Sequence, residues 1–385
     1  MNKVHIFLSP TKVIFGNDTS SLVGKEAAQF NAKKALIVTD KSLLAAGLLS
    51  GVQDSLKAQK IAFEIFDQVE AEPPAHIVDD GARIAVDGGV DIVIGVGGGS
   101  SLDVAKGIAL MTKNKGKILD YAGIDKVPLR GLPRILLPTT AGTGSEVTRT
   151  LVVSDKVENL KMAVHSNNAL ADVAIVDPLL TLSMPPHVTA DTGVDALVHA
   201  LETYVSVNTT PFAEILGIEA IRLIAENLPA AYAKGENITA RYNMSLGATV
   251  AGIAFCSGGV GAIHGLSNIL GLKYHMSHGR ANAVMLPYIV DYNKIGNLNK
   301  FARIAQVMGE NTEGLTSYQA SEKLVEALFK LLEIVGIPHR LRDYGATEAD
   351  IPELTEGGMK LSRLFVPNPR NMTEEDVRNI YASAL

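Results

Sequence analysis

The sequence contains a single cysteine, Cys256, among its 385 residues. No intrachain disulfide can therefore form, and a reducing cytoplasm is the simplest location for the protein. Long runs of lysine and arginine are also missing, and the formal net charge is -6 at pH 7. Because a duplex-binding surface normally needs a basic stripe, we expect no nucleic-acid partner. The N-terminus lacks the long apolar core of a signal peptide.

Charged side chains are absent from one long stretch, since no Asp, Glu, Lys or Arg occurs between Met244 and Leu272. The stretch is long enough to cross a bilayer of roughly 30 Å. However, glycines interrupt it repeatedly, and it contains His264 and Asn268. We therefore interpret it as closely packed, buried helical core and expect no membrane span.

The first half of the chain alternates strand-like and helix-like runs. Apolar runs that predict strands occur at residues 34–39, 61–66, 91–96 and 134–137, with helical patterns between them. Strands that alternate with helices predict βαβ units and a parallel sheet that is covered on both faces. We expect an α/β, doubly wound (Rossmann-like) domain over residues 1–183.

After residue 183 the strand patterns disappear and helical periodicity dominates. The sequence predicts one apolar helix face from Ile215, Leu216, Ile221 and Ile224, and another from Leu324, Leu328, Leu331 and Val335. Residues 373–376 have the pattern of a capping box that opens the last helix. At 385 residues the chain is long for a single core, so we expect a second, all-α domain over residues 184–385.

Three segments follow predicted strands and are candidates for a nucleotide site. Asp40 follows the first strand, Gly97–Ser100 follow the third, and Thr139–Ser145 follow the fourth. Ligands of open parallel sheets bind beyond the carboxyl ends of strands, and glycines before a helix let backbone N–H groups approach a pyrophosphate. Each segment also has an ordinary interpretation, as a solvated aspartate, a tight turn or a polar loop. Together they favour a dinucleotide, and Asp40 favours NAD over NADP.

Candidate metal ligands lie in the second half. Asp195 and His199 are spaced i, i+4, so on a helix they share a face and can chelate one cation. The alternative is an ordinary surface Asp–His pair. Three further histidines, His264, His275 and His278, occur in the glycine-rich stretch and just after it. One carboxylate with three neutral imidazoles suits a divalent first-row metal such as Fe(II) or Zn(II), and the sequence does not discriminate between these two.

At this point the residues match a family. The motifs are Gly97-Gly-Gly-Ser-Ser-Leu-Asp103, Thr139-Thr-Ala-Gly-Thr-Gly-Ser-Glu-Val-Thr-Arg149, Asp195-x-x-x-His199, His264-x(13)-His278-Gly and Asn368-Pro-Arg370. In this order, along essentially the whole chain, they resemble the iron-dependent (group III) alcohol dehydrogenases of the 1,3-propanediol dehydrogenase and lactaldehyde reductase types. The resemblance implies a Rossmann-like domain, a helical domain and an active site in the cleft between them.

The resemblance also implies roles for individual residues. Those that match metal ligands are Asp195, His199, His264 and His278. Those that match the NAD(H) site are Asp40, Gly97, Gly98, Gly99, Ser100, Thr139, Thr140, Ser145 and Lys161. Those that fall at the substrate pocket are Phe255, Val260 and Arg280, and we expect His278, Asn268 and Arg280 to take part in catalysis. The expected reaction is hydride transfer between NAD(H) and a small aldehyde or primary alcohol, with the metal as Lewis acid.

Two departures from the family pattern bear on the substrate. Asn268 stands where the family usually has a second histidine, and an amide cannot titrate for acid–base work. Arg280 stands where an apolar residue is usual, so one hypothesis is an anionic aldehyde such as sulfoacetaldehyde, held by the guanidinium. The alternatives are a neutral alcohol substrate with neutral drift at these positions or, from a different class, a lyase of the dehydroquinate synthase type. The resemblance alone suggests a homodimer or larger homo-oligomer.

Overall fold

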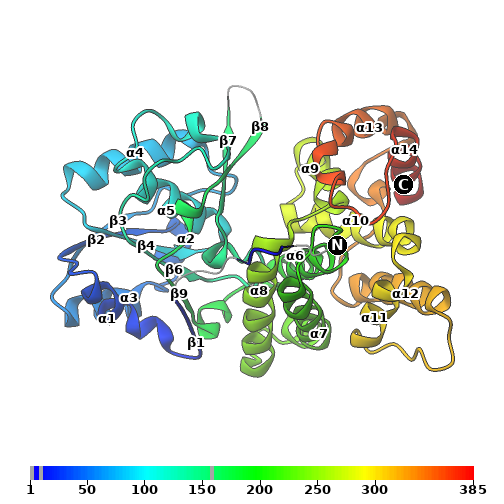
Figure 1. The fold of residues 1–385 in the computed structure, drawn as a ribbon. Helices are drawn as coiled ribbons and strands as arrows, with labels where there is room; N and C mark the ends of the chain where they lie inside the picture. Colours follow the sequence, from blue (N-terminus) through cyan, green and yellow to red (C-terminus); the bar gives the residue numbers. More distant parts are fainter. Residues whose placement is uncertain (1–3, 8–11, 157–159) are drawn as a thin grey trace. The chain divides into compact units, whose positions relative to one another are not determined.

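The computed structural model describes residues 4–7, 12–156 and 160–385, and these residues form two compact units. The first unit is Ser9–Leu182, and the second is Ser183–Leu385 together with the described residues 4–7. Figure 1 shows strands and helices in the first unit and helices in the second. Residues 1–3 and 8–11 of the predicted first domain lie outside the described residues.

The first unit is built on a six-stranded parallel sheet with the order β1-β9-β6-β4-β2-β3. Its strands are β1 (Val13–Phe15), β2 (Lys34–Val38), β3 (Ala62–Phe66), β4 (Ile92–Gly97), β6 (Arg134–Pro138) and β9 (Val173–Val176). All residues of β4 and β6 are buried, as expected of central strands that are covered on both faces. The predicted α/β domain with a parallel sheet is confirmed.

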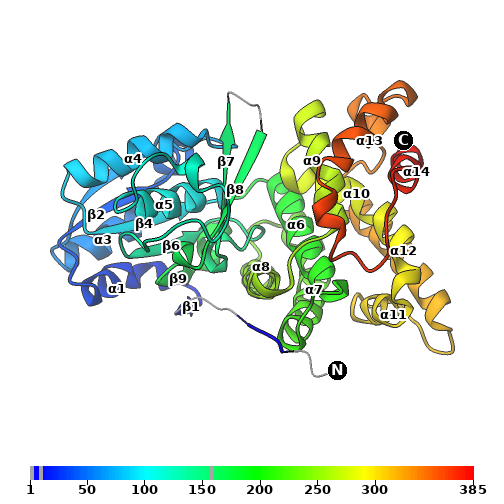
Figure 2. The ribbon, with the colours of Figure 1, turned by 45° about the horizontal axis from the view of Figure 1, so that its top comes forward.

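Two layers of helices cover the sheet, because successive side chains of a strand point to opposite faces. Leu36 and Val38 of β2 pack in one hydrophobic core, and Ile37 packs in the other. Figure 2 shows the two helical layers of this unit. The first core takes side chains from α4 (Ala75–Asp87) and α5 (Gly99–Met111), and the second takes them from α1 (Val23–Gln29) and α3 (Ser50–Ala58).

The order of the strands defines where a ligand of this sheet would lie. From β2 the chain forms β3 on one side of β2 and then returns to form β4 on the other side. This reversal is a topological switch point, and doubly wound sheets bind ligands beyond the strand ends there. Asp40 follows β2, and Gly97–Gly99 connect the end of β4 to the start of α5, so these two candidate segments flank the switch point.

A second, three-stranded sheet with the order β5-β8-β7 was not predicted from the sequence. It comprises β5 (Gly123–Ile124), β7 (Thr150–Asp155) and β8 (Leu160–His165), and β7 pairs with β8 in antiparallel register. Strands β7 and β8 each contain an apolar run of only three residues, Leu151–Val153 and Met162–Val164, and runs this short were not interpreted as strands.

The second unit is helical, and its described residues contain no strand, which confirms the predicted all-α domain. Helix α6 packs against α7, α8 and α10, and therefore lies at the centre of the unit. The nine α-helices are α6 (Pro186–Val205), α7 (Pro211–Ala233), α8 (Ile238–Gly258), α9 (Ala262–Tyr274), α10 (His278–Asn293), α11 (Leu298–Val307), α12 (Ser317–Ile334), α13 (Ile351–Met359) and α14 (Glu374–Ala384).

Two local expectations were wrong. Ile215 was expected on the buried face of α7, but it is 68% exposed, whereas Ile221 and Ile224 are fully buried. Small residues such as Gly217 and Ala220 complete the buried face and let α7 approach its neighbours closely. The N-terminal residues 4–7 pack with the helical unit and not with the sheet, and the ring of Phe7 lies 5.3 Å from that of Phe212.

The predicted capping box of the last helix is confirmed, because Thr373 and Asp376 exchange the expected hydrogen bonds. The apolar stretch between Met244 and Leu272 forms most of α8 and α9. In the part of the chain that the structure describes, no single helix is apolar and long enough to cross a membrane. Helices α8 and α9 are long and apolar enough only when they are taken together, and a bend of 109° separates them.

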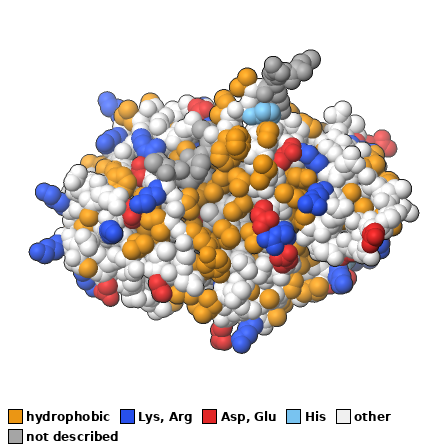
Figure 3. Space-filling view, turned by 60° about the horizontal axis from the view of Figure 1, so that its bottom comes forward, with side chains coloured by type: hydrophobic (Ala, Val, Ile, Leu, Met, Phe, Trp, Pro, Cys, Tyr) orange, Lys and Arg blue, Asp and Glu red, His pale blue; other side chains and the backbone are white. Residues whose placement is uncertain are grey.

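Some large apolar side chains reach the surface of the helical unit. Phe212 and Ile215 on α7, Val207 just before it and Ile238 on α8 are all exposed. Figure 3 shows one face of the molecule on which hydrophobic side chains gather. Exposed apolar patches often take part in protein–protein contacts.

Candidate functional site

Helix α6 carries three acidic or histidine side chains on one face. Asp195, His199 and Glu202 are spaced by four and three residues, which places them on successive turns of the same side. All three are buried. Buried ionisable side chains need hydrogen-bond or charge partners, and these three side chains have such partners within α6 and on α9.

Helix α9 begins at Ala262, so His264 lies in its first turn. The His264 side chain faces the same side of α6 as these three residues. The Nε2 atoms of His264 and His199 are 3.2 Å apart. Asp195, His199 and His264 each offer one ligand atom, and these atoms all lie within 4.8 Å of one another. The structure therefore brings three of the four predicted metal ligands into one buried cluster, the acid–histidine cluster.

Glu202 contacts the nitrogen of His264 that points away from His199. One carboxylate oxygen of Glu202 lies 2.6 Å from Nδ1 of His264, and the other accepts the backbone N–H of Ile263 at 2.6 Å. Burial alone would lower the pKa of His264, but the charges of Glu202 and Asp195 raise it above its ordinary value. The carboxylate thus fixes both the ring and the start of α9.

His278, the fourth predicted ligand, lies beside the cluster at the start of α10. Its Nε2 is 3.7 Å from a carboxylate oxygen of Asp195, its ring centroid is 5.2 Å from that of His264, and its side chain is 46% exposed. One turn later, Asn282 donates to Asp195 at 2.7 Å and accepts from the Ser267 hydroxyl.

The ionisation of Asp195 follows from these neighbours. Burial would raise the pKa of Asp195, but His199, His278 and His264, together with the amide of Asn282, lower it below its ordinary value. A buried carboxylate that stays ionised beside imidazole nitrogens is the donor set that a divalent first-row metal prefers. The cluster residues therefore fit such a metal.

The candidate substrate residues lie near this cluster in different ways. The ring of Phe255 on α8 stacks on His199, with centroids 5.0 Å apart and planes 22° apart. Asn268 lies one turn after His264 on α9, and Val260 lies in the short link between α8 and α9. Phe255 therefore contacts a predicted metal ligand directly, whereas Asn268 and Val260 are placed near the cluster only by their positions in the sequence.

Arg280 is engaged within the protein. Its Nε lies 2.6 Å from a carboxylate oxygen of Asp191, and the other oxygen of Asp191 accepts the hydroxyl of Ser277 at 2.7 Å. Asp191 lies one turn before Asp195 on α6, so this ion pair ties the start of α10 to α6. Burial would lower the pKa of Arg280, but Tyr344 and Asp191 raise it.

The glycine turn after β4 is closely packed against the 139–145 segment of the same unit. Gly97 has φ +153°, a conformation that favours glycine. A Cβ on Gly99 would come within 2.8 Å of Thr143, and a Cβ on Gly98 would meet Thr140 only at 3.5 Å. The turn opens α5, whose first N–H groups and dipole favour an anion.

The remaining predicted cofactor residues have partners inside the sheet unit. The carboxylate of Asp40 caps α2 (Lys41–Ala45) by accepting the N–H groups of Ser42 and Leu43. The hydroxyl of Ser145 donates to Asp103 at 2.6 Å. Lys161 forms an ion pair with Glu72 at 2.6 Å. Thr139 is buried, and Thr140 and Ser100 are partly exposed near the same turn.

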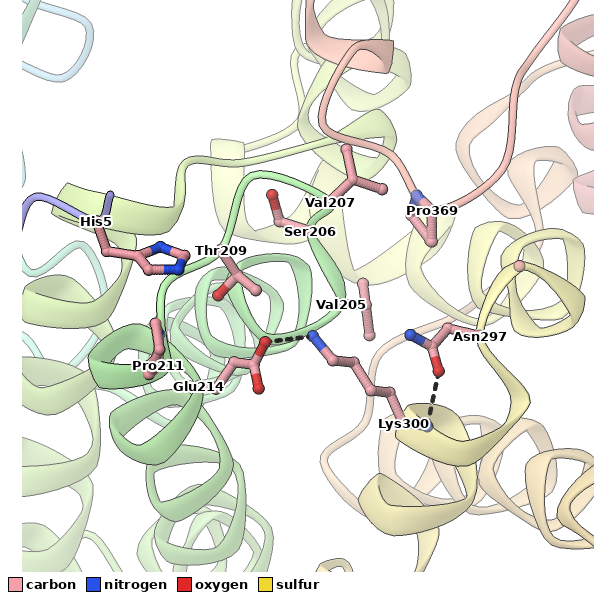
Figure 4. A pocket seen from close by; sticks show the side chains of 11 residues that line it. His5, Val205, Ser206, Val207, Thr209, Pro211, Glu214, Asn297, Lys300 and Pro369 are labelled. Atoms are coloured by element: carbon pink, nitrogen blue, oxygen red, sulfur yellow. Dashed lines mark hydrogen bonds and ion pairs between the residues drawn. The ribbon is translucent and has the colours of Figure 1, made fainter. Parts of the chain in front are cut away.

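A cavity of about 360 Å³ in the helical unit involves none of the predicted site residues. In Figure 4 the Lys300 side chain points to Glu214 across this cavity, and the two side chains are 2.8 Å apart. A much smaller cavity of about 10 Å³ shares Val205 and Pro369 with it and reaches Glu202. The candidate chemistry therefore lies with the acid–histidine cluster and not with this 360 Å³ cavity.

Sequence reasoning missed two residues of this site, Glu202 and Asn282. Both carried a signal in their spacing, because Glu202 is three residues after His199 and Asn282 is four residues after His278. Each spacing puts the side chain on the same helix face as a candidate ligand.

A doubly wound parallel sheet with a glycine turn at its switch point and a helical unit with a buried acid–histidine cluster are the features expected of a nucleotide- and metal-dependent enzyme. Comparison with known families agrees. Residues 10–178 match the model described as iron-containing alcohol dehydrogenase, and residues 189–385 match the C-terminal model of the Fe-containing alcohol dehydrogenase family. The chain belongs to the iron-containing alcohol dehydrogenase family.

Individual relatives are similar over nearly their whole length. The chain is 41% identical to the 1,3-propanediol dehydrogenase of Citrobacter freundii over 380 residues, which cover 98% of each chain. A solved structure of 1,3-propanediol oxidoreductase matches with a TM-score of 0.97, 39% identity and full coverage of both chains. Sulfoacetaldehyde reductase from Bifidobacterium kashiwanohense, in complex with NAD+, matches with a TM-score of 0.91 and 28% identity, over 100% of this chain and 99% of that one.

Proposed function

We propose that the protein interconverts a small aldehyde and the corresponding primary alcohol with NAD(H) as the hydride carrier and a divalent metal at the acid–histidine cluster. The observation that carries this proposal is the convergence of Asp195, His199 and His264 in the helical unit, with ligand atoms within 4.8 Å of one another. Membership of the iron-containing alcohol dehydrogenase family supports the same reaction.

Asp195, His199, His264 and His278 would hold the metal, which is Fe(II) by family membership, with Zn(II) as the alternative. A divalent metal bound there supplies a Lewis acid for the oxygen of the reacting carbonyl or alcohol. The protein contributes the geometry, because Glu202 and Asn282 fix the orientation of His264 and Asp195.

The cofactor would bind at the switch point of the sheet unit. Its pyrophosphate would meet the N–H groups of Gly97–Ser100 at the start of α5, where the helix dipole favours negative charge. One oxygen of Asp40 caps α2, and the second oxygen would accept from an adenosine ribose, which favours NAD(H). The related sulfoacetaldehyde reductase has a structure in complex with NAD+, which supports NAD(H) as the cofactor.

The remaining side chains would exclude water and hold the substrate. Phe255 packs on His199 and presents an apolar wall beside the cluster, and Val260 lies in the link that follows α8. Asn268 offers hydrogen bonds but cannot exchange a proton. The proton that accompanies hydride transfer must therefore pass through another group or through water.

We favour a neutral substrate. The guanidinium of Arg280 already pairs with Asp191 at 2.6 Å, so its charge is balanced inside the protein and is not free for an anion. The similarity to 1,3-propanediol dehydrogenase supports this choice. An anionic aldehyde such as sulfoacetaldehyde is the second candidate, and the similarity to a sulfoacetaldehyde reductase favours it.

Steady-state NADH oxidation by the Fe(II)-loaded protein tests the function and separates the two substrates. We expect a higher kcat/KM for propanal and lactaldehyde than for sulfoacetaldehyde, and we expect Arg280→Ala to change both classes alike through α10. A preference for sulfoacetaldehyde that Arg280→Ala abolishes would instead establish the anionic substrate. Absence of any net NADH turnover would contradict the oxidoreductase and favour a lyase.

Two further proposals rest on the sequence and stay predictions. Assembly into a homodimer or larger homo-oligomer is supported by exposed apolar side chains such as Phe212 and Ile215, and light scattering tests it. A cytoplasmic location is supported only by the single cysteine.

A further inference from the structure

Glu202 makes two contacts that both require an acceptor. One carboxylate oxygen receives the backbone N–H of Ile263, and the other faces Nδ1 of His264, each at 2.6 Å. Gly261 precedes α9 without a side chain to cap it, so Glu202 supplies the cap from α6. The same side chain therefore sets where α9 begins and how the ring of His264 is turned.

The contact with Nδ1 determines which nitrogen of His264 carries the proton. A carboxylate at 2.6 Å requires Nδ1 to donate, and in the neutral ring Nε2 then keeps its lone pair. That Nε2 faces His199 at 3.2 Å inside the acid–histidine cluster. The Glu202 contact thus aims a lone pair at the position where a cation would be held.

Other residues of the helical unit surround the Glu202 carboxylate and leave little space for solvent beside it. The adjoining cavity measures only about 10 Å³, room for no more than one water molecule. Asn293 and Asn368 exchange two amide hydrogen bonds of 2.7 Å at its wall, and a Cβ on Gly261 would lie 3.1 Å from Glu202. Solvent therefore competes little for the carboxylate.

We infer that Glu202 is a positioning residue, which holds His264 in the Nδ1-protonated form and fixes α9 so that the cluster retains its metal. The inference rests on the proposed function for the identity of the cation and on the contacts of Glu202 for the mechanism. A carboxylate behind a ligating histidine commonly changes metal affinity 10- to 100-fold.

The test compares Glu202→Gln with Tyr381→Phe. Glutamine offers one oxygen and one NH2 group, so it cannot accept from both Ile263 and His264, and an NH2 group facing Nδ1 would push the ring proton to Nε2. Tyr381 is a matched control, because its buried hydroxyl donates to the carbonyl of Leu266 on the same helix at 2.7 Å without touching the cluster.

Two readouts are made on the full-length protein. The first is the rate of Fe(II) and Zn(II) loss to a chelator, which we expect to rise about 10- to 100-fold in Glu202→Gln and to stay within about twofold of wild type in Tyr381→Phe. The second is the tautomer of the neutral His264 ring in the metal-free protein, measured by 15N NMR at a pH above the raised pKa of His264. We expect Nδ1–H in the wild type and in Tyr381→Phe, and Nε2–H in Glu202→Gln.

Equal metal loss from Glu202→Gln and Tyr381→Phe, or an Nε2–H tautomer in the wild type, would overturn the inference. If the wild type bound neither metal, the proposed function would fail, and the tautomer measurement would still decide the role of Glu202. If Glu202→Gln does not fold, Gly261→Ala replaces it, since the added Cβ would lie 3.1 Å from a Glu202 oxygen and push the carboxylate aside by a few tenths of an ångström. We then expect a smaller acceleration of metal loss, and an unchanged rate would overturn the inference.

Discussion

At the scale of single residues, Asn282 supports the buried charge of Asp195. It is fully buried, it donates to the Asp195 carboxylate, and its own oxygen accepts from Ser267. Its amide also lies 3.2 Å from Nε2 of His278. One side chain therefore connects the carboxylate to two of the three helices that build the site.

We predict that Asn282→Ala lowers the free energy of unfolding of the metal-free protein by about 2 kcal/mol, because it leaves a buried carboxylate and a buried hydroxyl without their partner. Denaturant unfolding measures this change. Asn299→Ala is the control, since Asn299 is exposed and accepts from the hydroxyl of Ser317 at the surface, and this variant should lose less than about 0.5 kcal/mol. Equal losses in the two variants would contradict the prediction.

The sequence carried part of the site at this scale. The four-residue spacing of Asp195 and His199 predicted their common face, because helical periodicity alone determines it. The contacts of Glu202 with Ile263 and of Arg280 with Asp191 depend on how α6, α9 and α10 pack, and no local pattern encodes that packing. Arg280 therefore looked free in the sequence although it is paired in the structure.

At the scale of secondary-structure elements, the two adjacent glycines between β4 and α5 have different roles. We expect Gly98 to leave space for a bound ligand and Gly99 to allow close packing within the protein. Gly98 has an ordinary negative φ, and a Cβ there would meet Thr140 only at 3.5 Å, which is a normal contact. A Cβ on Gly99 would come within 2.8 Å of Thr143 and force the neighbouring segment to move. The two adjacent glycines should therefore respond differently to alanine.

We predict that Gly98→Ala keeps the melting temperature within about 2 °C of wild type but raises the Kd for NADH about tenfold or more, because the added methyl group occupies the approach to the pyrophosphate. Gly99→Ala should lower the melting temperature as well. Calorimetry and NADH fluorescence titration measure both quantities. Unchanged NADH binding in Gly98→Ala would place the cofactor elsewhere.

Elements with strong periodicity were predicted well. The four predicted strands correspond to β2, β3, β4 and β6, and the heptad-like face of α12 is buried as expected at Leu324, Leu328 and Leu331. The face of α7 was misjudged, because its contacts with neighbouring helices use Gly217 and Ala220, which a search for large apolar residues overlooks. Close packing of small residues thus hides a buried face from sequence patterns.

At the scale of the whole molecule, two units with separate cores should respond to two different ligands. Binding to the native state protects the region that holds the ligand against local opening. We predict that Zn(II) alone slows amide hydrogen exchange in α6, α9 and the start of α10, and that NADH alone slows it in the β4–α5 turn and the 139–145 segment.

Hydrogen exchange with peptide-level mass spectrometry makes this measurement, and removal of the metal with a chelator should reverse only the first set of changes. Metal protection spread evenly over the sheet unit would contradict the prediction. The division into units near residue 183 followed from the change in periodicity, whereas the packing of residues 4–7 on the helical unit did not, because four residues carry no periodic pattern.

The uncharged stretch in α8 and α9 also has a consequence for synthesis of the chain on the ribosome. As it leaves the ribosome, a stretch this apolar is prone to aggregate until other residues cover it. Helices α6 and α7, against which α8 packs, precede it in the sequence and have already left the ribosome when it appears. Because α6 and α7 are made first, the apolar surface of α8 can be buried as soon as α8 has been synthesised. The helices α10 and α13, against which α9 packs, are synthesised only after α9.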